Sequence, residues 1–267
     1  MTITTITTHV EPHEGAALDA ALALPFALAE AHHAAVTALV FPIETALAEA
    51  CSPSWDLAAH EASAVAHVRS EAERRGVTCE IRPRSSFAYG AGEVVADQIR
   101  VSDLGVLFVQ GVPGLGQRML LNAALFDSGR PVLLVPDNTA PTASPTRIVI
   151  AWDGTPAAVR AVHGALPFLR VAAETRVVTV TDDKEMRPGQ SGIELTRLLA
   201  RHGARASFAA VPRSARSVLA ALAEEGGANA WLAMGVTRHS PLRNMVFGSA
   251  TQDLLEAGPP MPVLATA

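Results

Sequence analysis

The sequence is poor in cysteine, in aromatic residues and in long apolar runs. Its two cysteines, Cys51 and Cys79, lie far apart and form no Cys-x-x-Cys pair, which is typical of reduced thiols in a cytoplasmic protein. No apolar run reaches the roughly 18 to 20 residues that span a bilayer. The N-terminal stretch MTITTITTHV has neither the basic nor the apolar region of a signal peptide. We therefore expect a cytoplasmic protein with no membrane partner.

Positive charge is also scarce. The formal net charge of −5 argues against nucleic acid as a partner. Up to Thr146 the chain has 8 Lys and Arg against 16 Asp and Glu, a net of −8, whereas the remainder has 13 against 10, a net of +3. This split favours the second part for any anion site, although such splits also arise from solubility alone.

Small and aliphatic residues dominate the 49% of the chain that is hydrophobic, and apolar strand patterns alternate with helical ones on both sides of residues 136–146. That dividing stretch, PDNTAPTASPT, is rich in proline and small polar residues, as linkers are. In the first half we predict strands at 2–10, 34–43, 77–83, 104–111 and 131–136, and helices at 13–33, about 56–75, 92–103 and 116–129. In the second half we predict strands at 147–153, 175–183, 205–212, 229–235 and 261–266. The helices between them include one with Thr155 as N-cap and Pro156 in its first turn, and one that begins at Ser214.

This order of elements predicts an α/β protein made of two Rossmann-like domains. Each would hold a five-stranded parallel sheet with helices on both faces. We place the first domain at 1–137, a linker at 138–146 and the second domain at 147–267. The period of about 130 residues is too long for a solenoid and indicates a tandem duplication.

The carboxyl ends of the strands in the second half carry candidate binding residues, because ligands of open parallel sheets bind there. Asp153 ends the first strand of that half and precedes Gly154. Its carboxylate would accept from a ribose hydroxyl or a base amino group, or it would only cap the next helix; the residues leave both interpretations open. Val180, at the end of the second strand, is predicted to line an apolar wall for adenine.

A long loop joins the fourth strand of the second half to its last helix. Gly235 is predicted to let the chain turn sharply as it leaves the strand. The helix would start at Gly248 and Ser249, and the free N–H groups of Gly248, Ser249 and Ala250 would form an anion-binding terminus. An ordinary N-cap at Ser249 is the simpler alternative, but it would not require the loop.

These features resemble the universal stress protein family, and the chain is similar to a tandem two-domain member. Gly235, Gly248 and Ser249 match the family's motif Gly-x2-Gly-x9-Gly-Ser/Thr. The resemblance implies a cytoplasmic stress-response or regulatory protein that binds ATP, with or without Mg²⁺, in its second half and hydrolyses it slowly or not at all. It also implies an adenine nucleotide and an unidentified protein as partners. In an internal pseudo-dimer, PVLLVP would pair with MPVLAT, and a homodimer is a further option.

The match is incomplete, because Arg238 stands where the second glycine of the motif belongs. Its guanidinium would either occupy the phosphate site or grip a phosphate with help from Arg243, and we include Arg238 among the binding residues. In the first half Glu11 takes the place of Asp153. The stretch from Gly114 to Pro131 is 17 residues long, against 24 from Arg238 to Pro262, so we expect no anion site there.

Two rival functions remain. A scaffold that binds no nucleotide is indicated by Arg238 and by the short loop of the first half. An enzyme related to ATP pyrophosphatases is disfavoured, because WDGTPAA is not a Ser-Gly-Gly-rich loop. No nucleophile motif and no histidine pair at metal-ligand spacing is present, so we predict no catalytic residue and no metal site.

Overall fold

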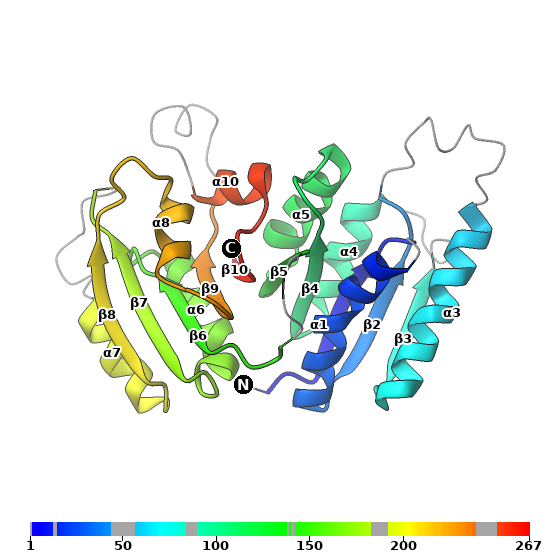
Figure 1. Cartoon of the computed structure of the whole chain (residues 1–267), viewed down its shortest axis with the longest axis horizontal. Helices are drawn as coiled ribbons and strands as arrows, with labels where there is room; N and C mark the ends of the chain where they lie inside the picture. The colour runs from blue at the N-terminus through cyan, green and yellow to red at the C-terminus, as the bar shows by residue number, and fades with distance from the viewer. Residues whose placement is uncertain are drawn as a thin grey trace.

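The computed structural model describes residues 2–12, 15–43, 57–83, 90–137, 139, 142–182, 192–238 and 250–267. Strands and helices alternate along these residues (Figure 1). The first half contains β1 (Thr5–Val10), α1 (Ala16–His32), β2 (Ala35–Val40), α3 (Leu57–Arg75), β3 (Cys79–Pro83), α4 (Ala91–Arg100), β4 (Leu104–Val109), α5 (Leu115–Asp127) and β5 (Val132–Pro136). The second half contains β6 (Arg147–Ala151), α6 (Pro156–Leu169), β7 (Glu174–Val180), α7 (Gly192–Arg201), β8 (Ala206–Val211), α8 (Val218–Glu224), β9 (Ala230–Gly235), α10 (Ala250–Ala257) and β10 (Val263–Thr266).

Capping side chains decide where two of the helices begin. The hydroxyl of Thr155 accepts from the Ala158 N–H at 3.2 Å, and Pro156 is the first residue of α6, so the predicted start is confirmed. The predicted start of α8 at Ser214 is wrong, because Ser214 has a left-handed backbone with φ of 57°. The cap is Ser217, three residues later.

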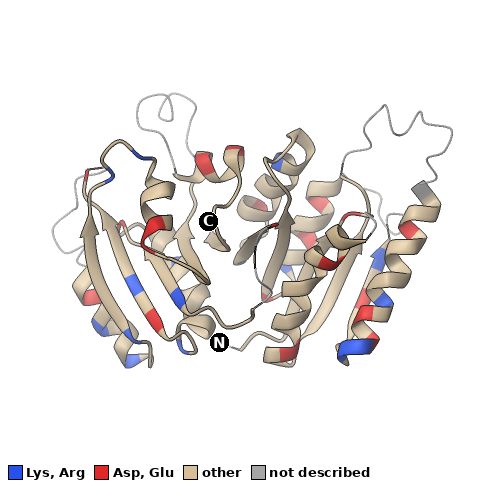
Figure 2. Cartoon of the chain, viewed as in Figure 1, with Lys and Arg blue, Asp and Glu red and all other residues tan. Residues whose placement is uncertain are grey.

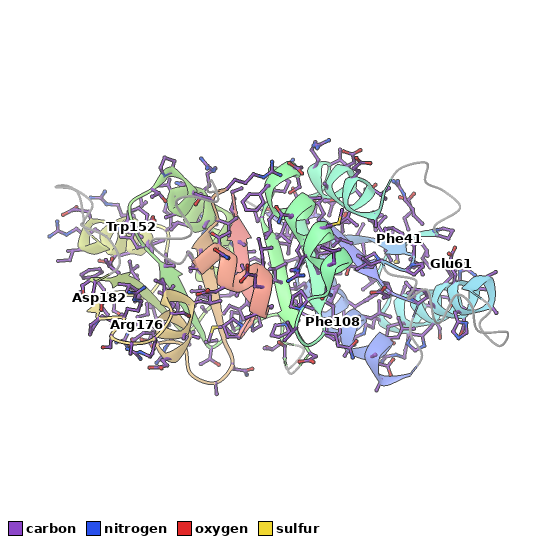
Figure 3. The ribbon with its side chains drawn as sticks, turned by 90° about the horizontal axis from the view of Figure 1, so that it is seen from above. Phe41, Glu61, Phe108, Trp152, Arg176 and Asp182 are labelled. Carbon is purple, nitrogen blue, oxygen red and sulfur yellow. The ribbon has the colours of Figure 1, made fainter. Side chains whose placement is uncertain are left out.

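The strands form one ten-stranded sheet in the order β3-β2-β1-β4-β5-β10-β9-β6-β7-β8. Pairing within each half is parallel, and both halves have the same strand order, which confirms the predicted α/β class. The halves meet through antiparallel pairing of β5 with β10, with Leu133 opposite Leu264. Seen from above, these two strands lie side by side in the middle of the molecule (Figure 3).

One apolar core runs through both halves on the face that α1, α6 and α7 cover. It includes Leu28 of α1, Leu133 of β5, Phe168 of α6 and Leu264 of β10, all at most 2% exposed. The Phe168 ring packs on Trp231 of β9, with ring centroids 5.0 Å apart. The helices α4, α5, α8 and α10 cover the opposite face. Shared packing of this kind holds the halves in one fixed orientation.

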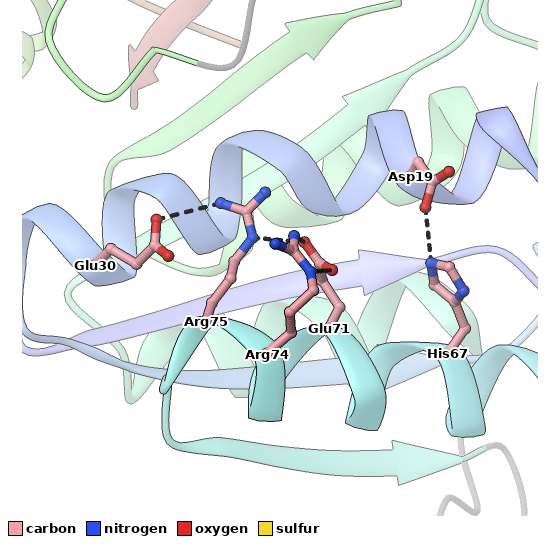
Figure 4. Close-up of polar contacts among 6 residues, drawn as sticks. All are labelled: Asp19, Glu30, His67, Glu71, Arg74 and Arg75. Carbon is pink, nitrogen blue, oxygen red and sulfur yellow. Dashed lines mark hydrogen bonds and ion pairs between the residues drawn. The ribbon is translucent and has the colours of Figure 1, made fainter.

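Helix α3 is fastened to α1 by polar contacts (Figure 4). Glu71 accepts hydrogen bonds from the guanidinium groups of Arg74 and Arg75, at 2.6 and 2.5 Å. Arg75 also donates to Glu30 of α1 at 3.2 Å. The hydrogen bond from Arg74, followed by the contacts with Arg75, lowers the pKa of Glu71 to about 2, against the opposing effect of burial.

We predict that Glu71→Gln removes an acid-sensitive part of the stability. Because the pKa of Glu71 is about 2 in the folded chain and near 4.5 without these contacts, its stabilisation is complete above pH 4.5 and is lost as the pH falls toward 2. Denaturant melts between pH 7 and pH 2.5 should show a smaller acid-induced loss for Glu71→Gln than for the parent. Glu61→Gln, on the same helix, is the control. Identical pH profiles for the parent and Glu71→Gln would contradict the assignment.

Candidate functional site

The strand order of the second half reverses beside β6. The chain passes from β6 to β7 on one side, whereas β9 lies on the other. In open parallel sheets, the carboxyl ends of strands at such a switch point form the usual ligand crevice. Ala151 pairs with Val178 and Ile150 with Ala233. The switch point therefore brings together the residues after Ala151, the end of β7 and the end of β9.

Asp153 lies just beyond β6, and its carboxylate is fastened to the start of α6. Its Oδ1 accepts from the backbone N–H of Thr155 at 3.0 Å and from the Thr155 hydroxyl at 2.7 Å. Gly154 between them has φ of 69°, a conformation that suits glycine. The N-cap of α6 is Thr155, so Asp153 does not cap the helix itself but accepts hydrogen bonds from its capping residue. The ligand role of Asp153 stays a prediction.

Val180 is the last residue of β7 and is partly exposed. By continuation of the register it lies next to Asp153, because Ala151 is opposite Val178. The neighbouring Trp152 has no role predicted from the sequence. Its indole N–H is buried and has no hydrogen-bond partner in the part of the chain that the structure describes. A large amphipathic side chain directly after an apolar strand was the signal that could have found it.

Gly235 ends β9 without a left-handed backbone, so a positive φ is not the reason for glycine here, and the sharp turn stays a prediction. The position is crowded instead. A Cβ placed on Gly235 would lie 2.4 Å from both the Ala157 carbonyl carbon and the Ala158 nitrogen. Glycine is therefore required because the end of β9 lies against the backbone of the first turn of α6.

Arg238 follows β9 and reaches toward the first half. Its guanidinium donates to Asp127 of α5 at 2.7 Å and lies 5.1 Å from the centroid of the Phe126 ring. In the sheet, β9 has β6 on one side and β10, followed by β5, on the other. Helix α5 leads into β5, so the Arg238 side chain extends away from β6 and Asp153. Obstruction of the crevice and a grip on phosphate, the two roles predicted for Arg238, both stay predictions.

The helix terminus predicted to bind anions lies mostly outside the described residues. Gly248, Ser249 and Arg243 are not among them. Ala250 is described, as the first residue of α10. The predicted roles of these residues therefore stay predictions.

At the equivalent strand ends of the first half, side chains form hydrogen bonds with the main chain. Glu11, the counterpart of Asp153, accepts from the Ile43 N–H at 2.8 Å. The imidazole of His9 donates to the Phe41 carbonyl at 2.8 Å, and the two rings are 4.7 Å apart. Side chains at the end of β1 thus hold the segment that follows β2, whereas Asp153 bonds the start of its own helix.

Within the described residues there is no cluster of three or more His, Cys, Asp or Glu side chains that could hold a metal ion. In that same part of the chain, no helix is long and apolar enough to cross a membrane.

The fold and the switch point define the class: an α/β protein of two Rossmann-like units joined edge to edge. No protein-family model and no curated protein matches the sequence. Among solved structures, a universal stress protein from Archaeoglobus fulgidus is similar, with a TM-score of 0.68 and 14% identity over 97% of this chain and 95% of that one. A Pseudomonas aeruginosa protein assigned to the universal stress proteins gives 0.60 and 17%, over 99% and 93%. A functionally unknown protein from the same species gives 0.60 and 17%, over 99% and 92%. The fold is that of universal stress proteins, and the resemblance is confirmed at this level.

We predict that Gly235→Ala destabilises the second half by about 1 to 3 kcal/mol, the usual cost of overpacking. The added methyl group would overlap the backbone of α6, which cannot move without disturbing the Thr155 cap and its hydrogen bonds to Asp153. Thermal melts would measure the loss. Gly90→Ala is the matched control, because the nearest atom to a Cβ there is 3.8 Å away; equal melting temperatures for the two variants would refute the close approach.

Proposed function

We propose that this chain is a cytoplasmic stress-response protein of the universal stress protein type that binds ATP at the switch point of its second half. Nucleotide occupancy would control its association with itself or with a protein partner, with little or no hydrolysis. Mg²⁺ would accompany the triphosphate rather than occupy a site built by the protein.

This proposal depends on the strand ends of β6, β7 and β9, which meet at the switch point. Asp153 and Gly154 follow β6, which has β7 with Val180 on one side and the end of β9 on the other. This crevice is the one that nucleotides use in doubly wound sheets. The mild positive charge of residues 147–267 fits a polyphosphate ligand.

The contrast between the halves supports one site rather than two. In the first half the bonds of Glu11 and His9 tie the segment after β2 across the equivalent edge. In addition, α5 starts at Leu115, directly after Gly114, which leaves a short connection from β4. We therefore assign binding to the second half alone.

A second candidate function is a scaffold that binds no nucleotide. One observation favours it: Asp153 and Arg238, the two charged side chains predicted to bind the ligand, already have partners inside the chain, in Thr155 and Asp127. A ligand would have to compete with these contacts or use main-chain groups instead.

Titration calorimetry with ATP and Mg²⁺ separates the two functions. We predict micromolar affinity for the parent, a drop of at least about tenfold for Asp153→Ala, which removes a charged acceptor, and no change for Glu11→Gln in the first half. Melting curves of each variant would confirm that it folds. If the parent shows no heat of binding at millimolar ATP, the nucleotide proposal fails and the scaffold stands.

We predict that Arg238→Gly changes ATP affinity by less than about threefold. The guanidinium is engaged by Asp127 and Phe126, so its removal should instead weaken the contact between the halves by about 1 kcal/mol, as for an exposed ion pair with a cation–π contact. Calorimetry and denaturant melts measure the two effects. A gain of tenfold or more in affinity would show that Arg238 obstructs the site, and an equal loss would show that it binds phosphate.

A further inference from the structure

Among the described residues, β3 is the last strand at one end of the sheet, and its outer edge has no paired strand. It pairs with β2, and no described strand lies beyond it. The Thr78 carbonyl accepts from the Val36 N–H of β2 at 2.9 Å. Because successive residues of a strand direct their main-chain groups to alternate sides, the N–H and C=O groups of Cys79 and Ile81 face outward. These are the groups with which an added strand would pair.

A groove accompanies this edge. It lies between β3 and the C-terminal part of α3 and has a volume of about 420 Å³, within the range of roughly 300 to 1,000 Å³ that is usual for binding pockets. In Figure 1, α3 lies outside β3 at the end of the sheet, so the helix forms the outer wall. The groove is lined by Arg69, Ala72, Glu73, Gly76, Val77, Thr78, Cys79 and Ile81.

The inner wall is apolar. Val77, Cys79 and Ile81 are partly buried and pack against the core under α3. Burial raises the pKa of the Cys79 thiol to about 11, so this side chain stays protonated at neutral pH and acts as an apolar surface rather than as a nucleophile. An aliphatic side chain would fit between these residues and Ala72 of α3.

The outer wall carries two opposite charges. Arg69 and Glu73 are exposed, and neither forms an ion pair with another described residue, whereas Glu71, Arg74 and Arg75 on the same helix are paired. Figure 2 shows the acidic and basic residues along α3. Because the chain reverses between α3 and β3, Glu73 lies toward the Cys79 end of the groove and Arg69 toward the Ile81 end.

We propose that this groove binds an extended peptide segment of a partner protein, which adds to the sheet as a further strand beside β3. Its main chain would bond to Cys79 and Ile81, in the manner of β-strand addition. One aliphatic side chain would enter the groove. An acidic side chain two residues to one side would meet Arg69, and a basic one two residues to the other side would meet Glu73.

A second copy of the chain fits this edge poorly. Antiparallel pairing of two β3 strands would place them about 4.8 Å apart, and the two α3 helices that lie outside them would approach far closer than the 8 to 10 Å at which helices pack. A single extended segment brings no helix with it. The position of α3 beside the strand edge therefore favours a single extended peptide.

The test uses two fluorescent heptapeptides with the parent chain: Thr-Glu-Thr-Val-Thr-Lys-Thr and the reversed-charge Thr-Lys-Thr-Val-Thr-Glu-Thr. The two peptides carry Glu and Lys in opposite order, so one suits a strand parallel to β3 and the other an antiparallel strand. We expect at least one to bind, with a dissociation constant of roughly 10 to 500 µM, and its analogue with N-methylated alternate residues to lose binding. Arg69→Glu should weaken binding of the preferred peptide by about threefold or more. The double variant Arg69→Glu with Glu73→Arg should reverse the preference between the two peptides.

Arg201→Glu, an exposed change on α7 at the other end of the sheet, is the matched control and should leave binding unchanged. All substitutions are at exposed helix positions, so the fold should persist, and melting curves would verify it. Binding of neither peptide, or binding that Arg69→Glu and the double variant leave unaltered, would overturn the proposal. So would sedimentation that shows a dimer of the parent that Arg69→Glu dissociates, because the groove would then be filled by a second copy.

Discussion

The antiparallel pairing of β5 with β10 is the interaction on which the rest of the molecule depends. It joins two parallel sheets into one and removes two edges that would otherwise be open. The same contact lets one apolar core pass from α1 to α6, with Phe168 and Trp231 on one side of the junction and Leu28 on the other. The orientation of the halves, and with it the reach of Arg238 to Asp127, follows from this pairing.

The two switch points of the sheet have the same topology but different chemistry. In the first half the side chains of Glu11 and His9 form hydrogen bonds with main-chain groups after β2. These polar side chains therefore already have partners across the strand ends. In the second half Asp153 accepts from the backbone and hydroxyl of Thr155, and the end of β9 lies directly against α6. One topology thus supports a closed edge in one copy and a candidate ligand site in the other.

The two ends of the sheet also differ. At β3 the helix α3 extends past the last strand and leaves a groove with apolar and charged walls. At β8 the side chain of Phe208 lies against Gly192 at the start of α7. An edge strand with no neighbouring element can pair with another chain. At β3 the helix α3 beside the edge limits such pairing to a single extended segment.

The sequence by itself determined the alternation of strands and helices and caps such as Thr155, because hydrophobic periodicity and capping are local properties of the chain. It also placed Asp153 and Val180 at strand ends. Only the tertiary structure decided why residue 235 is glycine, which depends on the α6 backbone that packs against it. The direction of Arg238 and the closure of the first half by Glu11 were likewise beyond the sequence. Each requires a partner far away in the chain, Asp127 or Ile43, and no local pattern encodes which distant groups the folded sheet will bring together.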